Sequence, residues 1–205
     1  MPPKATIIQV GKIESVIKPC KFEHMAFLNQ TIDFQQLSPE IKGAFPGGTA
    51  TRVLLPAGTS LFRFSGHDRL SPWWSETTEL GGLLLEAKTS GKPLYQYVRE
   101  TSAVLRKWYS NTMSNLVVAT LNQPVYAFKG IIGPQNEAAI YMNPLDKQNY
   151  KKKFTKPVYY RGGNGQIYIN GLTITCIQYV VPLGTVSVYD NIDEIIDFLI
   201  SYRLI

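Results

Sequence analysis

The second half of the chain is dominated by short runs of β-branched and aromatic residues, which is the pattern most typical of strands. These runs cover residues 116–121, 124–132, 157–160, 166–170, 172–180 and 185–189, and turn residues separate them. Two further runs, 51–55 and 60–64, flank a Pro-Ala-Gly-Thr turn and predict a hairpin. We therefore expect a sheet to form most of the molecule.

Two segments predict helices instead. In residues 92–113 apolar side chains recur at i, i+3, i+4 and i+7 and include Trp108, while Arg99 lies on the opposite face, which should meet solvent. Residues 191–203 carry a similar stripe, and Asn191 or the preceding aspartate can cap their first turn. Strands and helices do not alternate regularly. The sequence therefore predicts an α+β fold with strand-rich mixed or antiparallel sheets and not a doubly wound α/β fold.

Length and hydropathy favour one domain. The chain has 205 residues, of which 44% are hydrophobic, and no long linker divides it. We expect a single domain over 1–205, in which 1–50 form an N-terminal extension or cap and 51–205 form the core. No stretch reaches the roughly 18 apolar residues of a membrane helix, and the first residues lack the apolar centre of a signal peptide. These features predict a protein that is made in the cytoplasm, does not bind membranes, and leaves the cell, if at all, without a conventional signal peptide.

Charge and motifs narrow the function. The formal net charge of +6 favours approach to an anion such as a dinucleotide, a nucleic acid or an acidic partner. The two cysteines and two histidines give neither a disulfide framework nor a zinc pattern, so we expect no metal. The sequence contains no P-loop, no Gly-x-Ser-x-Gly and no His-Glu-x-x-His motif. This excludes the enzyme classes that depend on those motifs.

The first candidate site segment is Leu61-Phe62-Arg63-Phe64-Ser65-Gly66. Arg63 alternates with two phenylalanines on a predicted core strand. A buried arginine needs a partner or a cleft, and its rigid fork of donors suits a diphosphate or a carboxylate. The alternative is that Arg63 lies on the solvent face of the strand.

The second segment is Leu70-Ser71-Pro72-Trp73-Trp74-Ser75, within a polar stretch over 67–82 that predicts a loop. One tryptophan can pack on the core while the other offers a flat surface to a ring such as nicotinamide or adenine. The alternative is that both tryptophans only anchor the loop.

The third segment runs from Tyr160 to Ile169 and contains Gly162-Gly163-Asn164-Gly165-Gln166. It opens no helix, which excludes a Rossmann motif. Its glycines can let the backbone approach a ligand closely and can leave N–H groups for a phosphate. Gln166 begins a strand and can hold a ribose hydroxyl or orient a water. The alternative is an ordinary hairpin turn.

Taken together, these segments resemble the NAD glycohydrolase toxins related to the tuberculosis necrotizing toxin, within the wider ADP-ribosyltransferase-like set. The resemblance covers residues 53–170 in patches: an arginine-bearing strand after a Leu-Pro-x-Gly-Thr turn, a Ser-Pro loop, a Val-Tyr-x-Phe-x-Gly strand and the glycine-rich run before Gln166. It implies an ADP-ribosyltransferase-like fold, NAD as the substrate, and a cognate inhibitor or immunity protein as a partner. It also implies that Gln166 is catalytic and that the residues that bind NAD are Arg63, Ser65, Ser71, Trp73, Trp74, Tyr160 and Gly163.

The chain departs from the family pattern at two points. The transferases carry a glutamate on the late strand where this chain has Gln166. They also carry a Ser-Thr-Ser strand, and this chain has only Ser71 or Ser75 as a poor match to its serines. The missing glutamate favours hydrolysis, or transfer to an unusual acceptor, over ADP-ribosylation of protein arginine. Departure of nicotinamide depends on positioning and electrostatics more than on a strong base, which agrees with the scarcity of histidine.

Two other functions remain open. A basic nucleic-acid or nucleotide binding module is indicated by cationic and aromatic residues that are interleaved late in the chain. These are Lys147, Tyr150, Lys151, Lys152, Lys153, Phe154, Lys156, Tyr159, Tyr160 and Arg161. A non-enzymatic interaction protein is the third possibility. The NAD interpretation predicts that Arg63 and Gln166 open onto one cleft, and a placement of the two residues on opposite faces of the sheet would remove its basis.

Overall fold

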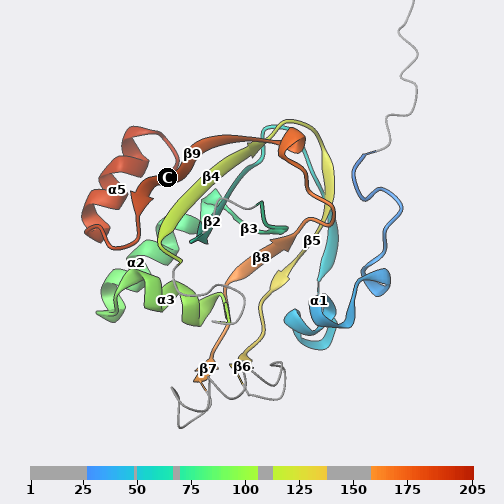
Figure 1. The fold of residues 1–205 in the computed structure, drawn as a ribbon, viewed down its shortest axis with the longest axis horizontal. Helices are drawn as coiled ribbons and strands as arrows, with labels where there is room; N and C mark the ends of the chain where they lie inside the picture. The colour runs from blue at the N-terminus through green and yellow to red at the C-terminus, as the bar shows by residue number, and fades with distance from the viewer. Residues whose placement is uncertain (1–26, 49, 67–69, 106–112, 138–157) are drawn as a thin grey trace, which may run out of the picture.

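The structure is a computed structural model that describes residues 27–48, 50–66, 70–105, 113–137 and 158–205. Seven strands form one sheet in the order β1-β5-β8-β3-β2-β4-β9, and every neighbouring pair in it is antiparallel (Figure 1). Its strands are β1 (Thr51–Leu55), β2 (Ser60–Ser65), β3 (Trp73–Glu76), β4 (Asn115–Leu121), β5 (Val125–Ile131), β8 (Gly165–Tyr168) and β9 (Ile177–Ser187). A small second sheet joins β6 (Gln135–Glu137) to β7 (Val158–Tyr160).

The described residues include four α-helices: α1 (Pro39–Ala44), α2 (Leu80–Ser90), α3 (Leu94–Thr101) and α5 (Ile192–Ser201). Short 3₁₀ helices lie at Phe34–Gln36, Pro46–Gly48, Thr77–Glu79 and Ile174–Cys176. The fold is thus α+β with a large antiparallel sheet, as the sequence predicts. No helix within these ranges is both long and apolar enough to cross a bilayer.

Helices α2, α3 and α5 gather against β2, β4 and β9 at one end of the sheet (Figure 1). The core between them contains Phe64 of β2, Leu84 of α2, Val98 of α3 and Leu199 of α5, all buried. Asn191 caps α5 by accepting a hydrogen bond from the N–H of Asp193, which confirms the predicted cap.

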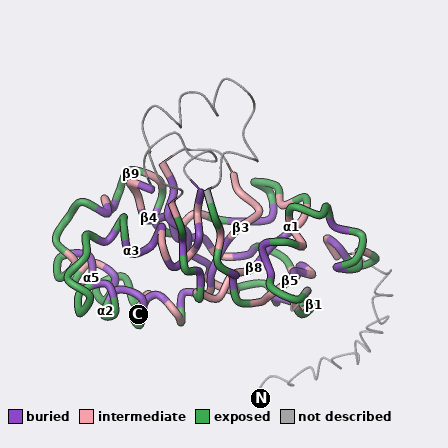
Figure 2. Tube along the Cα trace, turned by 90° about the horizontal axis from the view of Figure 1, so that it is seen from below, coloured by how far each residue is buried: buried purple, intermediate pink, exposed green. Residues whose placement is uncertain are grey.

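The other face of the sheet encloses a second core. Leu55 from the edge strand β1 and Ile177 from the opposite edge strand β9 belong to the same cluster as Trp74 and Ile167. Because both edges contribute to one cluster, the sheet is curled around it. Figure 2 shows the strands buried at the centre, with the exposed segments of the helices at the periphery.

Residues 27–48 cover part of the sheet. Phe34, Leu37 and Phe45 pack against Phe128 of β5 and Tyr168 of β8 in a third cluster. This segment therefore contributes to the core on the side of β5 and β8, close to the pocket described below.

The prediction of a hairpin over 51–64 is wrong. Strand β1 pairs with β5, whereas β2 lies between β3 and β4. The turn between them is tied to the end of β4: the N–H of Gly58 donates to the Leu121 carbonyl, and the N–H of Leu121 donates to the Thr59 carbonyl. The turn therefore passes the chain to another part of the sheet.

The helix predicted over 92–113 ends at Thr101. Ala103 follows in a left-handed conformation with φ of 48°, and the N–H of Val104 folds back to the Arg99 carbonyl. Arg99 was expected to face solvent but is only 7% exposed, because this returning turn covers it. Residues 106–112, and with them Trp108, lie outside the described residues.

Two other expectations need correction. The loop expected over 67–82 contains β3 and the start of α2. The two strands expected over 172–189 are one strand, β9, which begins only at Ile177. Strand β9 contains Pro182, but it is an edge strand, where a proline need not interrupt the ladder.

Candidate functional site

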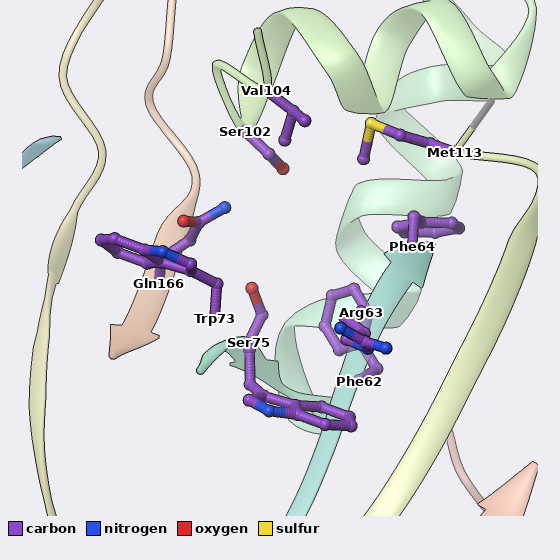
Figure 3. Close-up of a pocket in the computed structure, with 10 residues that line it drawn as sticks. Phe62, Arg63, Phe64, Trp73, Ser75, Ser102, Val104, Met113 and Gln166 are labelled. Carbon is purple, nitrogen blue, oxygen red and sulfur yellow. The ribbon is translucent and has the colours of Figure 1, made fainter. Parts of the chain in front are cut away.

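The sheet opens between β2 and β3. These strands pair only at Leu61 with Glu76 and at Phe62 with Ser75, while β2 continues along β4 to Ser65. A pocket lies where β2 and β3 separate (Figure 3). It is lined by Phe62, Arg63, Phe64, Trp73, Trp74, Ser75, Ser102, Val104, Met113 and Gln166. The structure thus brings Arg63, Trp73, Trp74 and Gln166, chosen from the sequence, to one pocket.

The pocket is partly open to solvent and has a volume of about 50 Å³. A cavity needs about 10–15 Å³ by this measure to hold one water, so this one holds a few heavy atoms. A dinucleotide would therefore put only a small group inside and leave its remainder outside this volume.

Arg63 and Gln166 enter the pocket from opposite faces of the sheet. By strand register Arg63 shares a face with Leu61 and Trp74, whereas Gln166 shares a face with Ser75. Both reach the pocket because the sheet is open at this point. Both residues line the pocket, but their place on opposite faces of the sheet is the outcome that was expected to count against the NAD interpretation.

Arg63 is the one cationic residue among the described residues that line the pocket. Arg63 is only 8% exposed, so the alternative that it lies on the solvent face is wrong. Its Cζ lies 5.1 Å from the centroid of the Trp74 ring, within the range of a cation–π contact. Because the guanidinium does not deprotonate in proteins, the pocket keeps this charge at any ordinary pH.

The two tryptophans have different surroundings. Trp74 is 1% exposed and its Nε1 donates to the Ser71 carbonyl at 2.8 Å. Trp73 is partly exposed, and its ring lies 4.9 Å from that of Tyr168 and 5.5 Å from that of Phe45. Trp74 is thus a core residue that also borders the pocket, while Trp73 is the more accessible of the two.

Four residues expected to bind NAD do not line this pocket: Ser65, Ser71, Tyr160 and Gly163. The Ser71 hydroxyl accepts a hydrogen bond from the N–H of Trp73, so it shapes the turn before β3. Ser65 and Tyr160 are buried at 1% and 2% exposure. Tyr160 packs with Phe128 and Tyr168 in the third core cluster.

The glycine-rich run does not offer its N–H groups to a phosphate. The N–H groups of Gly162, Gly163 and Asn164 donate to the carbonyls of Glu100, Ile132 and Thr101 at 2.9–3.1 Å. A Cβ on residue 162 would lie 2.4 Å from the Ile132 carbonyl oxygen. The close approach that Gly162 allows is therefore to the protein's own backbone, and the Gly163 N–H is bonded to the Ile132 carbonyl and not left for a phosphate. The run clamps the end of α3 to the sheet.

Two polar residues of the pocket had no role assigned from the sequence. The Ser75 hydroxyl donates to the Gly165 carbonyl at 2.8 Å, and the Ser102 hydroxyl accepts from Asn164 Nδ2 at 3.2 Å. Figure 3 shows Ser75, Ser102 and Gln166 on one side of the pocket and Phe64 and Met113 on the other. Ser75 appeared only as a poor match to a family serine. No sequence signal marked Ser102, which follows α3.

A half-buried carboxyl lies behind the strand that bears Gln166. The Glu79 carboxylate oxygens lie 2.6 and 2.7 Å from the position that a Cβ on residue 165 would take, so a side chain there would displace the Glu79 carboxylate. Burial raises the pKa of Glu79, the nearby Lys129 lowers it, and Glu76 raises it. Lys129 itself forms an ion pair with Glu76. Glu79 lies outside the pocket lining.

Comparison with known proteins gives neither a matching family model nor a matching curated protein. Two solved structures contain chains that match this one. A chain of the complex of Tne2 with Tni2 is 16% identical, with a TM-score of 0.36, and the match covers 65% of this chain and 89% of that one. A chain of the complex of Rhs1-CT with its cognate immunity protein RhsI1 is 13% identical, with a TM-score of 0.41 and coverage of 64% and 77%. At these values the function has to be argued from the pocket.

Proposed function

We propose that this chain is an NAD-cleaving enzyme of the bacterial-toxin type, an NAD glycohydrolase or mono-ADP-ribosyltransferase with an ADP-ribosyltransferase-like core. The observation that carries the proposal is that Arg63 and Gln166, distant in the sequence, line one pocket together with Trp73 and Trp74. These are the residues for which the sequence resemblance implies contact with NAD.

Arg63 supplies the charge that a dinucleotide requires. Arg63 is buried, its guanidinium lies against the Trp74 ring, and the residue lines the pocket. A planar fork of N–H donors matches the oxygens of a diphosphate, and low exposure strengthens that attraction. We assign Arg63 to the NAD phosphates.

Gln166 acts at the reacting ribose. The bond between C1′ of the ribose and the nicotinamide nitrogen breaks, and its electron pair neutralises the pyridinium. A water then attacks C1′ and its proton passes to solvent, so the products are ADP-ribose, nicotinamide and H⁺. The Gln166 amide can hold a ribose hydroxyl or orient that water, because it carries both donors and an acceptor. Stabilisation at this point is specific to the transition state.

Hydrolysis is the favoured outcome. A glutamine occupies the position where the resembling transferases carry a glutamate, so no carboxylate at that position activates an acceptor nucleophile. Transfer to an unusual acceptor is the second form of the proposal. A cognate inhibitor protein that blocks NAD access is the partner that a toxin of this type requires.

The competing proposal is a basic nucleic-acid binding module. Residues 147–156, which carry most of its lysines, lie outside the described residues. Arg161 of the same run has its Cζ 5.2 Å from the centroid of the Tyr97 ring, an intramolecular contact. No described contact favours this module over the pocket.

Incubation of the purified protein with NAD tests the proposal, with nicotinamide and ADP-ribose measured by chromatography. Equal amounts of the two products indicate hydrolysis. Nicotinamide in excess of free ADP-ribose indicates transfer to an acceptor. If NAD remains intact while the protein retards nucleic acid in a gel, the binding module replaces the enzyme.

A further inference from the structure

A chain of hydrogen bonds fixes which way the Ser102 hydroxyl can act. The Thr101 hydroxyl donates to the Tyr97 carbonyl at 2.9 Å, so its oxygen accepts from Asn164 Nδ2 at 2.8 Å. This sets the orientation of the Asn164 amide, and the same nitrogen donates to Ser102 Oγ at 3.2 Å. A carbonyl can only accept, so the chain has one direction. The Ser102 hydroxyl therefore keeps its own proton, which it can donate to a group bound in the pocket.

The Ser75 hydroxyl has the opposite polarity. It donates its only proton to the Gly165 carbonyl at 2.8 Å, and a carbonyl cannot return one. The lone pairs of Ser75 Oγ are therefore what this side chain offers the pocket. Both serines line the same pocket of about 50 Å³. Besides the Gln166 amide, the pocket thus presents one hydrogen-bond donor from Ser102 and one acceptor from Ser75.

From this polarity we infer that Ser102 and Ser75 form a subsite for a primary carboxamide and set the specificity of the proposed reaction. A carboxamide carries an acceptor oxygen and a donor nitrogen side by side, the complement of Ser102 and Ser75. Its three heavy atoms also agree with the few atoms that the cavity holds. The inference rests on the proposed function, in which the nicotinamide of NAD carries this group.

A carboxylate in the same place would meet a mismatch. Its second oxygen would face the lone pairs of Ser75 with no proton between them, which leaves buried acceptors unsatisfied. The subsite should therefore distinguish NAD from nicotinic acid adenine dinucleotide, which differs only by a carboxylate in place of the carboxamide. Arg63 lines the same pocket and its charge attracts a carboxylate, so the measured preference is the net of the mismatch at Ser75 and the attraction to Arg63.

The test compares kcat/KM of the full chain for these two dinucleotides, measured by release of the free base. We expect NAD to be preferred by about 10- to 100-fold, the effect of one mismatched buried polar contact. Equal rates, or a preference for the carboxylate, would overturn the inference while the proposed function stands. Cleavage of neither dinucleotide would overturn both.

Two variants separate the serines. Ser75→Ala removes the lone pairs that reject the carboxylate, so the preference ratio should fall toward one. Ser102→Ala removes a donor that both groups can use, so both kcat/KM values should fall about tenfold with the ratio unchanged. The ratio is internal to each protein, and partial unfolding therefore cancels from it. Ser201→Ala, at an exposed serine that donates to the Phe198 carbonyl, is the matched control and should keep the wild-type ratio. A wild-type ratio in Ser75→Ala would contradict the assignment.

Discussion

Replacing Gly162 by alanine should loosen the clamp that holds the end of α3 against the sheet. Gly162 has φ of 68°, and a Cβ there would lie 2.4 Å from the Ile132 carbonyl oxygen and 2.6 Å from that of Gly133. These neighbours are backbone atoms, so they cannot rotate away as a side chain can. The glycine run has to shift, and with it the Asn164 side chain that orients Ser102.

The expected loss of folding stability in Gly162→Ala has two parts. A left-handed conformation costs an alanine about 1–2 kcal/mol, and overpacking against the backbone adds about 1–3 kcal/mol. Gly91 separates these parts, because its φ of 66° is nearly the same and a Cβ there would contact nothing within 4 Å. Gly91→Ala should therefore show the conformational cost alone. Gly162→Ala should be less stable than Gly91→Ala by about 1–3 kcal/mol.

Urea denaturation followed by tryptophan fluorescence measures this difference, since the buried Trp74 reports on the core. In a chain of this size each kcal/mol corresponds to a shift in melting temperature of about 2–4 °C. Equal stabilities for Gly162→Ala and Gly91→Ala would refute the close approach of residues 132–133 and 162. The orientation assigned to Ser102 would then lose its support.

Three further predictions concern charge and catalysis. Arg63→Ala should chiefly raise KM for NAD in steady-state kinetics, because the phosphate charge is present in both ground and transition states; a fall in kcat alone would contradict this. Gln166→Ala should lower kcat by a factor on the order of 10² with little change in melting temperature, and an unchanged kcat would remove Gln166 from the reaction. Burial raises the pKa of Glu79 above its usual 4.5, so the folded state favours the protonated form and ionisation costs stability above the raised pKa. Glu79→Gln should therefore melt higher than the wild type at pH 7, and this difference should shrink as the pH falls toward 4.5; a difference independent of pH would exclude this cause.

The strands with strong local patterns were predictable. Residues 116–121 and 124–132 correspond to β4 and β5 within a residue or two, because apolar β-branched side chains identify buried strands without knowledge of the partner. The α5 cap at Asn191 was predictable for the same reason, since it depends on neighbouring residues alone.

The missed elements depend on partners that are distant in the sequence. Trp73 and Trp74 form a strand only because they pair with Tyr168 and Ile167 of β8. Helix α2 contains Gly81 and Gly82, whose propensity opposes a helix, and it is held by the burial of its leucines against the sheet.

The pocket was predictable in part. A strand arginine, a tryptophan pair and a glutamine after glycines are residue types that suggest a site, and the structure brings Arg63, both tryptophans and Gln166 together. The role of Ser102 could not be predicted, because its polarity is set by Asn164 across a contact between distant segments. The glycine run was expected to offer its N–H groups to a phosphate. These groups instead donate to backbone carbonyls of distant segments, which composition cannot reveal.

Release of nicotinamide from NAD by the wild-type protein and by Gln166→Ala, followed side by side at saturating NAD, tests the central claim most directly. The account predicts steady release by the wild type and a rate lower by a factor on the order of 10² in a variant that melts at nearly the same temperature. Intact NAD after prolonged incubation with the folded wild type, or equal rates from both proteins, would contradict it.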